Sequence, residues 1–285
     1  MKHIIITGAS SGIGHELTAN FLKRGYFVWG GVRNPETLAN LKQQYPQTLE
    51  VLKLDVTSNA DIESAFQKIS QVGVASLSLV NNAGLALGGP IEAIDLDEWR
   101  KLFDVNVFGL LRMTQVFLPL LRKTKGRVIN IGSISGRMSS PFLAPYTSSK
   151  YAVRAITDSL RRELRTLGVK VVLIEPGPIK TDIWDKSIQS SRKLEAKISP
   201  ELHRVYGEAL ENLVLAVEDV AKNAVPISFV TEKVVRAVEL ENPYPYYLVG
   251  KGIHLQALVL RLMPVRWLDA IFARGFRFQK TEKRA

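Results

Sequence analysis

The feature that most constrains the fold is a regular alternation of apolar, β-branched runs with segments whose apolar side chains recur every three or four residues. The apolar runs predict strands at residues 3–7, 27–32, 50–54, 77–81, 127–131 and 169–174. Runs that are apolar on both faces are typical of a parallel sheet covered by helices on both sides. With right-handed crossovers, this pattern predicts an α/β fold: a Rossmann-type, doubly wound parallel sheet with its ligand at the carboxyl ends of the strands.

The 285 residues contain no internal repeat and no Gly/Ser-rich linker, so we expect one domain. Residues 1–250 are the predicted dinucleotide-binding catalytic domain. An insertion at about 183–225 is expected to hold substrate-specific structure, including a helix with apolar residues from Leu202 to Val220, and a short strand follows at 246–249. Residues 251–285 are a basic, apolar C-terminal extension.

Composition excludes several classes of site and partner. The chain has no cysteine, which rules out disulfides, thiolate metal sites and cysteine nucleophiles, and we expect no metal centre. No nucleic-acid-binding module accompanies the net charge of +11, so no nucleic-acid partner is expected. The N-terminus lacks a secretory pattern, and no window approaches the roughly 18 apolar residues of a spanning helix, so we expect a cytoplasmic protein.

A glycine-rich turn follows the first predicted strand and opens a helix. It contains Gly8, Gly12 and Gly14 in a GxxxGxG spacing, together with Ser10, Ser11 and Ile13. Such a turn lets the backbone approach a pyrophosphate, which then faces the amides and the positive dipole of the helix start. A plain tight turn is the alternative, but the position at strand one and helix one favours a dinucleotide site.

The residues after the second strand bear on the choice of cofactor. NAD-dependent enzymes usually place a carboxylate there to bind the ribose 2′-hydroxyl, whereas this chain has Arg33 and Asn34. A guanidinium can bind a 2′-phosphate through two hydrogen bonds. We therefore expect NADP, with NAD as the alternative; a solvated surface arginine is the simpler interpretation of Arg33.

Two further strand ends carry candidate adenosine contacts. Asp55 and Val56 follow the third strand, and the Asp55 carboxylate could accept from the adenine amino group or cap the next helix. Asn82, Ala83 and Gly84 follow the fourth strand, where small residues leave room for the ribose. The asparagine amides are expected to tie neighbouring strands together.

The chemistry is assigned to Tyr146, Lys150 and Ser133. Tyr146 and Lys150 are four residues apart and share one face of a predicted helix, and Ser133 follows the fifth strand. A nearby ammonium favours the phenolate, so Tyr146 can act as general acid or base, while the Ser133 hydroxyl can bond the substrate oxygen. Each residue alone also has an ordinary structural interpretation, as a helix-start aromatic, a solvated charge or a cap.

These motifs together resemble the short-chain dehydrogenase/reductase family. The resemblance rests on TGASSGIG, NNAG, Ser133, the YxxxK of Tyr146 and Lys150, and Pro176-Gly177-Pro178, and it covers residues 3 to about 182. It implies that Asn106 holds a water as part of a proton relay to Lys150. It also implies that Ile179 and Thr181, beside Pro176 and Gly177, contact the nicotinamide carboxamide and phosphates, and that Lys150 and Tyr146 contact the cofactor. The family commonly forms homodimers or homotetramers.

The expected function is hydride transfer between NADP(H) and a hydrophobic ketone, aldehyde or alcohol. The residues expected to border the substrate are apolar: Leu85, Leu87, Phe142, Leu143, Ile183 and Trp184, with only Arg137 and Lys180 as nearby cations. A looser similarity to 17β-hydroxysteroid and retinol dehydrogenases implies a steroid-, retinoid- or lipid-like substrate. The alternatives are a nucleotide-binding redox sensor or scaffold without turnover, and an epimerase or dehydratase.

The C-terminal extension supports a separate hypothesis. Between Ile253 and Phe272 its apolar residues are interleaved with Arg261 and Arg266, and Arg274 follows. This mixture is typical of interfacial helices, and peripheral contact with an anionic membrane is one hypothesis for the extension. The same pattern also fits a helical lid over the pocket or a contact between subunits, with arginine stems covering apolar surface.

Overall fold

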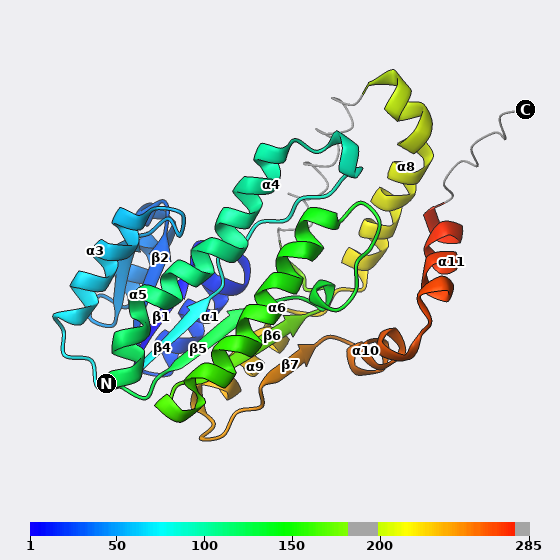
Figure 1. The fold of residues 1–285 in the computed structure, drawn as a ribbon. Coiled ribbons are helices and arrows are strands. Elements are labelled where there is room, and N and C mark those ends of the chain that lie inside the picture. The colour runs from blue at the N-terminus through cyan, green and yellow to red at the C-terminus, as the bar shows by residue number, and fades with distance from the viewer. Residues whose placement is uncertain (182–198, 277–285) are drawn as a thin grey trace, which may run out of the picture.

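The computed structural model describes residues 1–181 and 199–276, and its centre is a seven-stranded sheet (Figure 1). The strand order is β3-β2-β1-β4-β5-β6-β7, and every neighbouring pair is parallel. The strands are β1 (His3–Thr7), β2 (Phe27–Val32), β3 (Leu49–Lys53), β4 (Leu77–Asn81), β5 (Arg127–Ile131), β6 (Lys170–Pro176) and β7 (Tyr246–Val249). The predicted doubly wound α/β fold is confirmed.

Two strands differ from the predicted bounds. Strand β3 lies one residue earlier because Leu49 pairs with Val28. Strand β6 continues two residues further, because Glu175 and Pro176 pair with Leu248 and Val249 of β7. The apolar pattern stops at Glu175, so sequence periodicity alone ends the strand too early.

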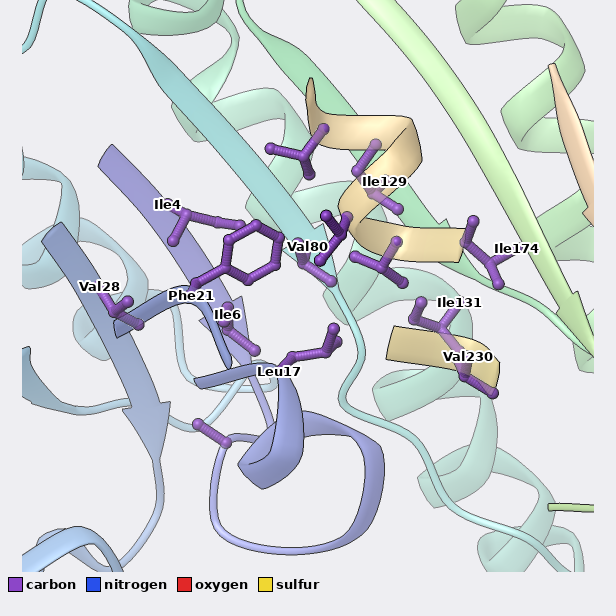
Figure 2. Close-up of a cluster of buried hydrophobic side chains, with 14 of the residues drawn as sticks. Ile4, Ile6, Leu17, Phe21, Val28, Val80, Ile129, Ile131, Ile174 and Val230 are labelled. Carbon is purple, nitrogen blue, oxygen red and sulfur yellow. The ribbon is translucent and has the colours of Figure 1, made fainter. Parts of the chain in front are cut away.

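Helices cover both faces of the sheet. On one face lie α1 (Gly12–Lys23), the short α2 (Ala39–Gln44) and α9 (Ser228–Glu239). On the other lie α3 (Asn59–Ser70), α5 (Leu110–Lys123) and α6 (Ala144–Leu164). Figure 2 shows Leu17 and Phe21 of α1 packed with Ile4 and Ile6 of β1, while Ile5 between them belongs to the cluster on the opposite face. This alternation explains why the strands carry apolar residues on both faces.

The remaining elements lie at or near the carboxyl edge of the sheet or connect the helices. They include α4 (Leu96–Phe103), a π-helical turn (Asp104–Gly109), and 3₁₀ turns at Pro35–Leu38, Ile91–Ala93, Ile134–Gly136 and Arg165–Leu167. Helix α8 (Pro200–Lys222) confirms the predicted helix around residues 202–220, and the Ser199 side chain caps it by accepting from the Leu202 amide. After β7, α10 (Ile253–Leu262) and α11 (Val265–Phe276) follow, and α11 lies beside α8 (Figure 1).

A third apolar cluster joins the late helices to the loop before α6. Phe142 packs edge-on against Phe276 of α11 and Tyr206 of α8, with ring centroids 5.7 and 6.1 Å apart. Leu210 and Leu213 of α8 complete its buried centre. This cluster is separate from the two clusters that flank the sheet.

Candidate active site

The parallel topology gathers the predicted site residues at one edge of the sheet. Each candidate follows the carboxyl end of a strand, where a doubly wound sheet binds its ligands. These strand ends carry Gly8 after β1, Arg33 after β2, Asp55 after β3, Asn82 after β4, Ser133 after β5 and Gly177 after β6.

The glycine-rich turn has two positions where only glycine fits. A Cβ atom on Gly14 would lie 2.1 Å from the Gly8 carbonyl oxygen and 2.5 Å from Asn82 Nδ2, and Gly8 itself has a φ of +66°. Asn82 Nδ2 donates to the Thr7 and Gly8 carbonyls at 2.9 and 3.2 Å. The buried Thr7 hydroxyl accepts from the Asn82 and Ala83 amides. The turn is therefore held tightly against the end of β4, as expected for the asparagine amides.

The start of α1 fits a bound phosphate. Ser11 is the N-cap residue, yet its side chain accepts no capping hydrogen bond, and the first turn, which includes Ile13, contains no acidic residue. Ser10 and Ser11 are exposed, so the amides of this helix end face an accessible cradle. A Cβ on Gly12 would lie 3.7 Å from the Thr181 side chain, which places Thr181 opposite the phosphate turn.

Arg33 and Asn34 have different surroundings. Arg33 is exposed and makes no hydrogen bond or ion pair with the residues that the structure describes. Asn34 Oδ1 accepts from the Glu36 amide at 3.2 Å and caps the 3₁₀ turn at Pro35–Leu38. Arg33 is thus available for a 2′-phosphate, whereas Asn34 also shapes the turn behind it.

Asp55 does not cap the following helix. Its Oδ1 accepts from the Thr57 amide at 2.9 Å and from the Thr57 hydroxyl at 2.7 Å, and the N-cap of α3 is Ser58. The alternative that Asp55 caps the following helix is therefore wrong, and the contact of Asp55 with adenine stays a prediction. Val56 is buried against the π-helical turn, where a Cβ on Gly109 would lie 2.7 Å from Val56 Cγ2.

Ser133 and Tyr146 meet at the reacting end. The Ser135 amide donates to Ser133 Oγ at 3.1 Å, which leaves the Ser133 hydroxyl hydrogen to be donated elsewhere. Burial raises the pKa of the Tyr146 phenol, and a hydrogen bond with the Ser133 side chain acts in the opposite direction. Tyr146 is therefore protonated at neutral pH in the free protein and is oriented by Ser133.

Lys150 is a buried cation beside this phenol. Its Nζ lies 5.7 Å from the Tyr146 ring centroid and donates to the Ile131 carbonyl at 3.0 Å. Burial lowers the pKa of Lys150 to about 8. The turn that carries Ser133 packs directly on α6, because a Cβ on Gly136 would lie 2.8 Å from the Lys150 carbonyl oxygen.

Asn106 lies in the π-helical turn between α4 and α5, and not in a regular helix. Its Oδ1 accepts from the Leu85 amide at 2.7 Å, and its Nδ2 donates to the Leu85 carbonyl and to Ser149 Oγ. A Cβ on Gly84 would lie 3.4 Å from Asn106 Oδ1 and 3.9 Å from Lys150 Nζ, so these groups converge around Gly84. Both amide hydrogens of Asn106 are used in this clamp, its Oδ1 can accept one more hydrogen bond, and its role in a water relay stays a prediction.

The segment after β6 contributes through its backbone. Pro176 ends β6, and the Gly177 amide donates to the Val249 carbonyl at 2.8 Å. Ile179 bridges to Val225 and its side chain is buried in the core, so the side chain itself faces away from a cofactor. The expected contact of Ile179 with nicotinamide therefore has to come from the main chain.

Glu175 is a site residue that sequence reasoning missed. It is fully buried, and its two carboxylate oxygens accept from Arg137 Nε at 3.0 and 3.1 Å. The carboxylate also forms ion pairs with the Arg137 and Arg154 guanidinium groups. Arg137 is accordingly ion-paired with Glu175, which it shares with Arg154, and is not the free substrate-side cation that its position in the sequence suggested. The only signal was one carboxylate in an apolar strand, and periodicity gives no partner for it.

The expected substrate-bordering residues fall into three groups. Leu85 is 40% exposed and Leu87 is partly buried, whereas Phe142 is buried in the third apolar cluster. Phe142 has a φ of +65° and its carbonyl accepts from the Gly89 amide, so the two loops that carry Leu87 and Leu143 are joined. Ile183 and Trp184 lie outside the described residues.

A cavity of about 370 Å³ lies beside this region. It is lined by Ser139, Ser140, Pro141, Phe142 and Ala144 from the loop and start of α6, by Asp269, Phe272 and Ala273 of α11, and by Ile91. Ala144 is two residues before Tyr146, but Tyr146 itself is not part of the lining. The cavity therefore lies beside the loop that leads into α6, and α11 lines one side of it.

Comparison with known proteins agrees with this geometry. The family model for short chain dehydrogenase matches residues 2–192. The chain is 40% identical over 279 residues to the NADPH-dependent 3-dehydrocapnine reductase of Ornithobacterium rhinotracheale, covering 95% of this chain and 96% of that protein. It is 32% identical to estradiol 17-beta-dehydrogenase 2 of Mus musculus, covering 99% of this chain and 77% of the other.

Solved structures show the same likeness. A short-chain dehydrogenase from Streptomyces avermitilis superposes with a TM-score of 0.76 at 25% identity, covering 98% of each chain. One from Burkholderia cenocepacia, in complex with NADP, has a TM-score of 0.72 at 26% identity and covers 95% of this chain and 99% of its own. The chain thus belongs to the short-chain dehydrogenase/reductase family and is an oxidoreductase acting on CH–OH groups and the corresponding carbonyls.

Proposed function

We propose that this protein is an NADPH-dependent reductase of a hydrophobic ketone, with Tyr146 as the proton donor. The observation that carries the proposal is the meeting of Tyr146 with Ser133 and Lys150 at the carboxyl edge of the sheet. The exposed, unpaired Arg33 after β2 supports NADP over NAD, since a guanidinium suits a 2′-phosphate. When bound, the cofactor supplies the hydride.

The residues of the chain supply the proton and the orientation. The Ser133 hydroxyl, fixed by the Ser135 amide, donates to the substrate oxygen and polarises the carbonyl. Tyr146 gives its proton to the same oxygen as it becomes an alcohol oxygen. Lys150 stabilises the phenolate that remains, and Asn106 and Ser149 hold the first turn of α6 in register with the Leu85 loop.

The protonation state of Tyr146 sets the pH dependence of both reaction directions. Reduction needs the protonated phenol, and burial raises the Tyr146 pKa above its ordinary value of about 10. We therefore expect the reduction rate to fall, and the rate of alcohol oxidation to rise, only as the pH approaches this raised pKa. Initial rates in both directions from about pH 7 to about pH 11 would check this, and a reduction rate that already falls between about pH 7 and about pH 9 would contradict it.

The substrate is proposed to be a lipid-like ketone. Residues of the loops around the site are apolar, and the Arg137 guanidinium is engaged by the buried Glu175 carboxylate. A relative that matches nearly the full chain is named for reduction of 3-dehydrocapnine, and another for estradiol. 3-Dehydrocapnine is consequently the first compound to test, followed by steroid, retinoid and long-chain ketones.

The direct test is NADPH consumption with these compounds, run beside NADH and beside Tyr146→Phe. We expect turnover with NADPH, and a loss of at least about 10²-fold in Tyr146→Phe with NADPH binding retained. Near-normal turnover in that variant would refute the assignment. NADPH binding without turnover of any ketone would favour a redox sensor or scaffold instead.

We also propose a homodimer or homotetramer, which sedimentation velocity would test.

A further inference from the structure

Helices α10 and α11 expose an unusual amount of apolar surface. Seven large apolar side chains between 41% and 72% exposed lie on these two helices: Leu255, Leu258, Val259, Leu262, Val265, Trp267 and Ile271. We call these residues, except Val265, the outer face, because Val265 lies on the side of α11 that carries Phe272 and Phe276. In Figure 1 the two helices extend away from the sheet after β7, with α8 beside α11. Exposed apolar patches of this kind mark interaction sites.

Cationic residues surround the outer face. Lys251, Arg266 and Arg274 are exposed in the same segment. Residues 251–285 contain eight Lys and Arg against two acidic residues, more than half of the net charge of +11 of the whole chain. Apolar side chains mixed with cations and a tryptophan complement an anionic lipid surface. Insertion of the apolar side chains and attraction of the cations both lower the free energy of the bound state.

A second copy of the chain fits this surface less well. In a two-fold symmetric contact the patch packs against its own copy, so one net positive surface would meet a second net positive surface. Spanning the bilayer is also excluded for this part of the chain. Across residues 1–181 and 199–276, no helix is long and apolar enough to cross a membrane. The pattern therefore favours a pair of helices that lies on an anionic membrane.

The opposite side of α11 faces the candidate active site. Phe276 is buried in the cluster with Phe142, and Phe272 packs against this cluster and lines the 370 Å³ cavity with Asp269 and Ala273. Helix α11 thus has an outer face toward solvent and an inner face toward the cavity beside α6. A membrane on the outer face would lie one helix diameter, about 10 Å, from that cavity.

We infer that the outer face of α10 and α11 docks on an anionic membrane and that the protein takes a lipid-soluble ketone from this membrane through the cavity under α11. The inference rests on the proposed reductase function for its substrate, while the docking itself does not depend on turnover. Docking positions the cavity next to the lipid phase in which a hydrophobic ketone is concentrated. A short soluble ketone needs no such route.

The test compares the full chain with Trp267→Glu/Ile271→Glu, which changes the outer face and none of the residues that line the cavity. The matched control is Val72→Glu/Leu167→Glu, because Val72 and Leu167 are 50% and 47% exposed and precede β4 and β6 at the opposite edge of the sheet. Cosedimentation uses phosphatidylcholine vesicles with and without about 30% phosphatidylglycerol. Reductase rates are measured with a short soluble ketone and with a long-chain ketone carried in the vesicles.

We expect binding to the anionic vesicles only, reduced at least about tenfold in the outer-face variant and unchanged in the control variant. The outer-face variant should keep its rate on the soluble ketone and lose rate on the vesicle-borne ketone. Absence of vesicle binding by the full chain would overturn the inference, and so would equal binding by all variants. It would also be overturned if the only effect of the outer-face substitutions were a change from dimer to monomer. Vesicle binding without reduction of any ketone would leave docking in place and refute the proposed function.

Discussion

At the scale of single residues, the reacting end depends on a cation held where water is scarce. Lys150 is 8% exposed, and its burial lowers its pKa from 10.5 to about 8. Between these two values the unfolded chain binds more protons than the folded one, so the contribution of this group to stability rises with pH. Below pH 8 the buried ammonium lowers the free energy of unfolding by its full amount, on the order of 3 kcal/mol.

Lys150→Met should therefore stabilise the cofactor-free protein at pH 7 while abolishing turnover. We expect a gain of about 2 kcal/mol, because the lost hydrogen bond to the Ile131 carbonyl offsets part of the relieved desolvation. The gain should shrink as the pH rises from 8 toward 10.5. Urea unfolding of both proteins at pH 7 and pH 10 measures it. A variant less stable than the parent at pH 7 would show that the ammonium is stabilising in place.

We propose that Arg33 sets the cofactor preference through one charge at an exposed position. We expect Arg33→Glu to raise the KM for NADPH at least about tenfold, because a bidentate cation is replaced by a repelling carboxylate. The KM for NADH should change little, which makes NADH the internal control. Steady-state kinetics with both cofactors give the answer, and an equal rise for the two would assign Arg33 to a general structural role.

At the scale of elements, the site depends on how three segments are fixed to one another. Glu175 of β6 pairs with Arg137, which follows the Ser133 turn, and with Arg154, one turn beyond Lys150 on α6. Arg137 and Arg154 also lie over the ring of Tyr246 in β7, at 5.7 and 4.8 Å from its centroid. One buried carboxylate thus joins the Ser133 turn, the catalytic helix and the strand that leads to Gly177.

Glu175→Gln should destabilise the fold by about 3 kcal/mol, since it leaves two partly buried guanidinium groups without their carboxylate. It should also lower kcat at least about tenfold by loosening the Ser133–Tyr146 geometry, with little change in NADPH affinity. Asp158→Asn is the matched control, because Asp158 lies on α6 with Arg154 and also contacts Tyr246 and an arginine. Equal effects of the two substitutions on kcat would remove Glu175 from the positioning of the site.

At the scale of the whole molecule, the packing divides into a rigid sheet and a separate cap. Two large clusters on the two faces of the sheet share its strands, whereas the cluster of Phe142, α8 and α11 stands apart. Elements with a small cluster of their own open at lower free energy than the core. The cap over the cavity is therefore expected to open without unfolding of the sheet.

Hydrogen exchange should resolve this division. Amides of α8 and α11 are expected to exchange at least about tenfold faster than those of β1, β4 and β5, and to slow when NADPH and a hydrophobic ketone are added together. Helix α1 and helix α5, each packed on the sheet, provide the comparison within the same molecule. Exchange of α8 and α11 at the rate of the sheet would indicate one cooperative unit.

The sequence by itself determined the architecture and the class of reaction. Strands with apolar residues on both faces require cover on both sides, which fixes a parallel sheet and brings all strand ends to one edge. The glycine spacing and the four-residue separation of Tyr146 and Lys150 are local, so they could be recognised without any long-range contact. The same holds for the helix at 200–222, which its periodicity predicted.

Only the tertiary structure decided which charges were free and which surface was covered. Glu175 meets Arg137 and Arg154 across 38 and 21 residues of chain, and no periodicity encodes such a pairing. Likewise, Asp55 shapes its own turn while Ser58 caps the helix, and the side chain of Ile179 enters the core. Apolar side chains look alike in a sequence whether they end up beneath a helix, as Phe276 does, or on its outer face, as Trp267 does, because burial depends on what packs against them.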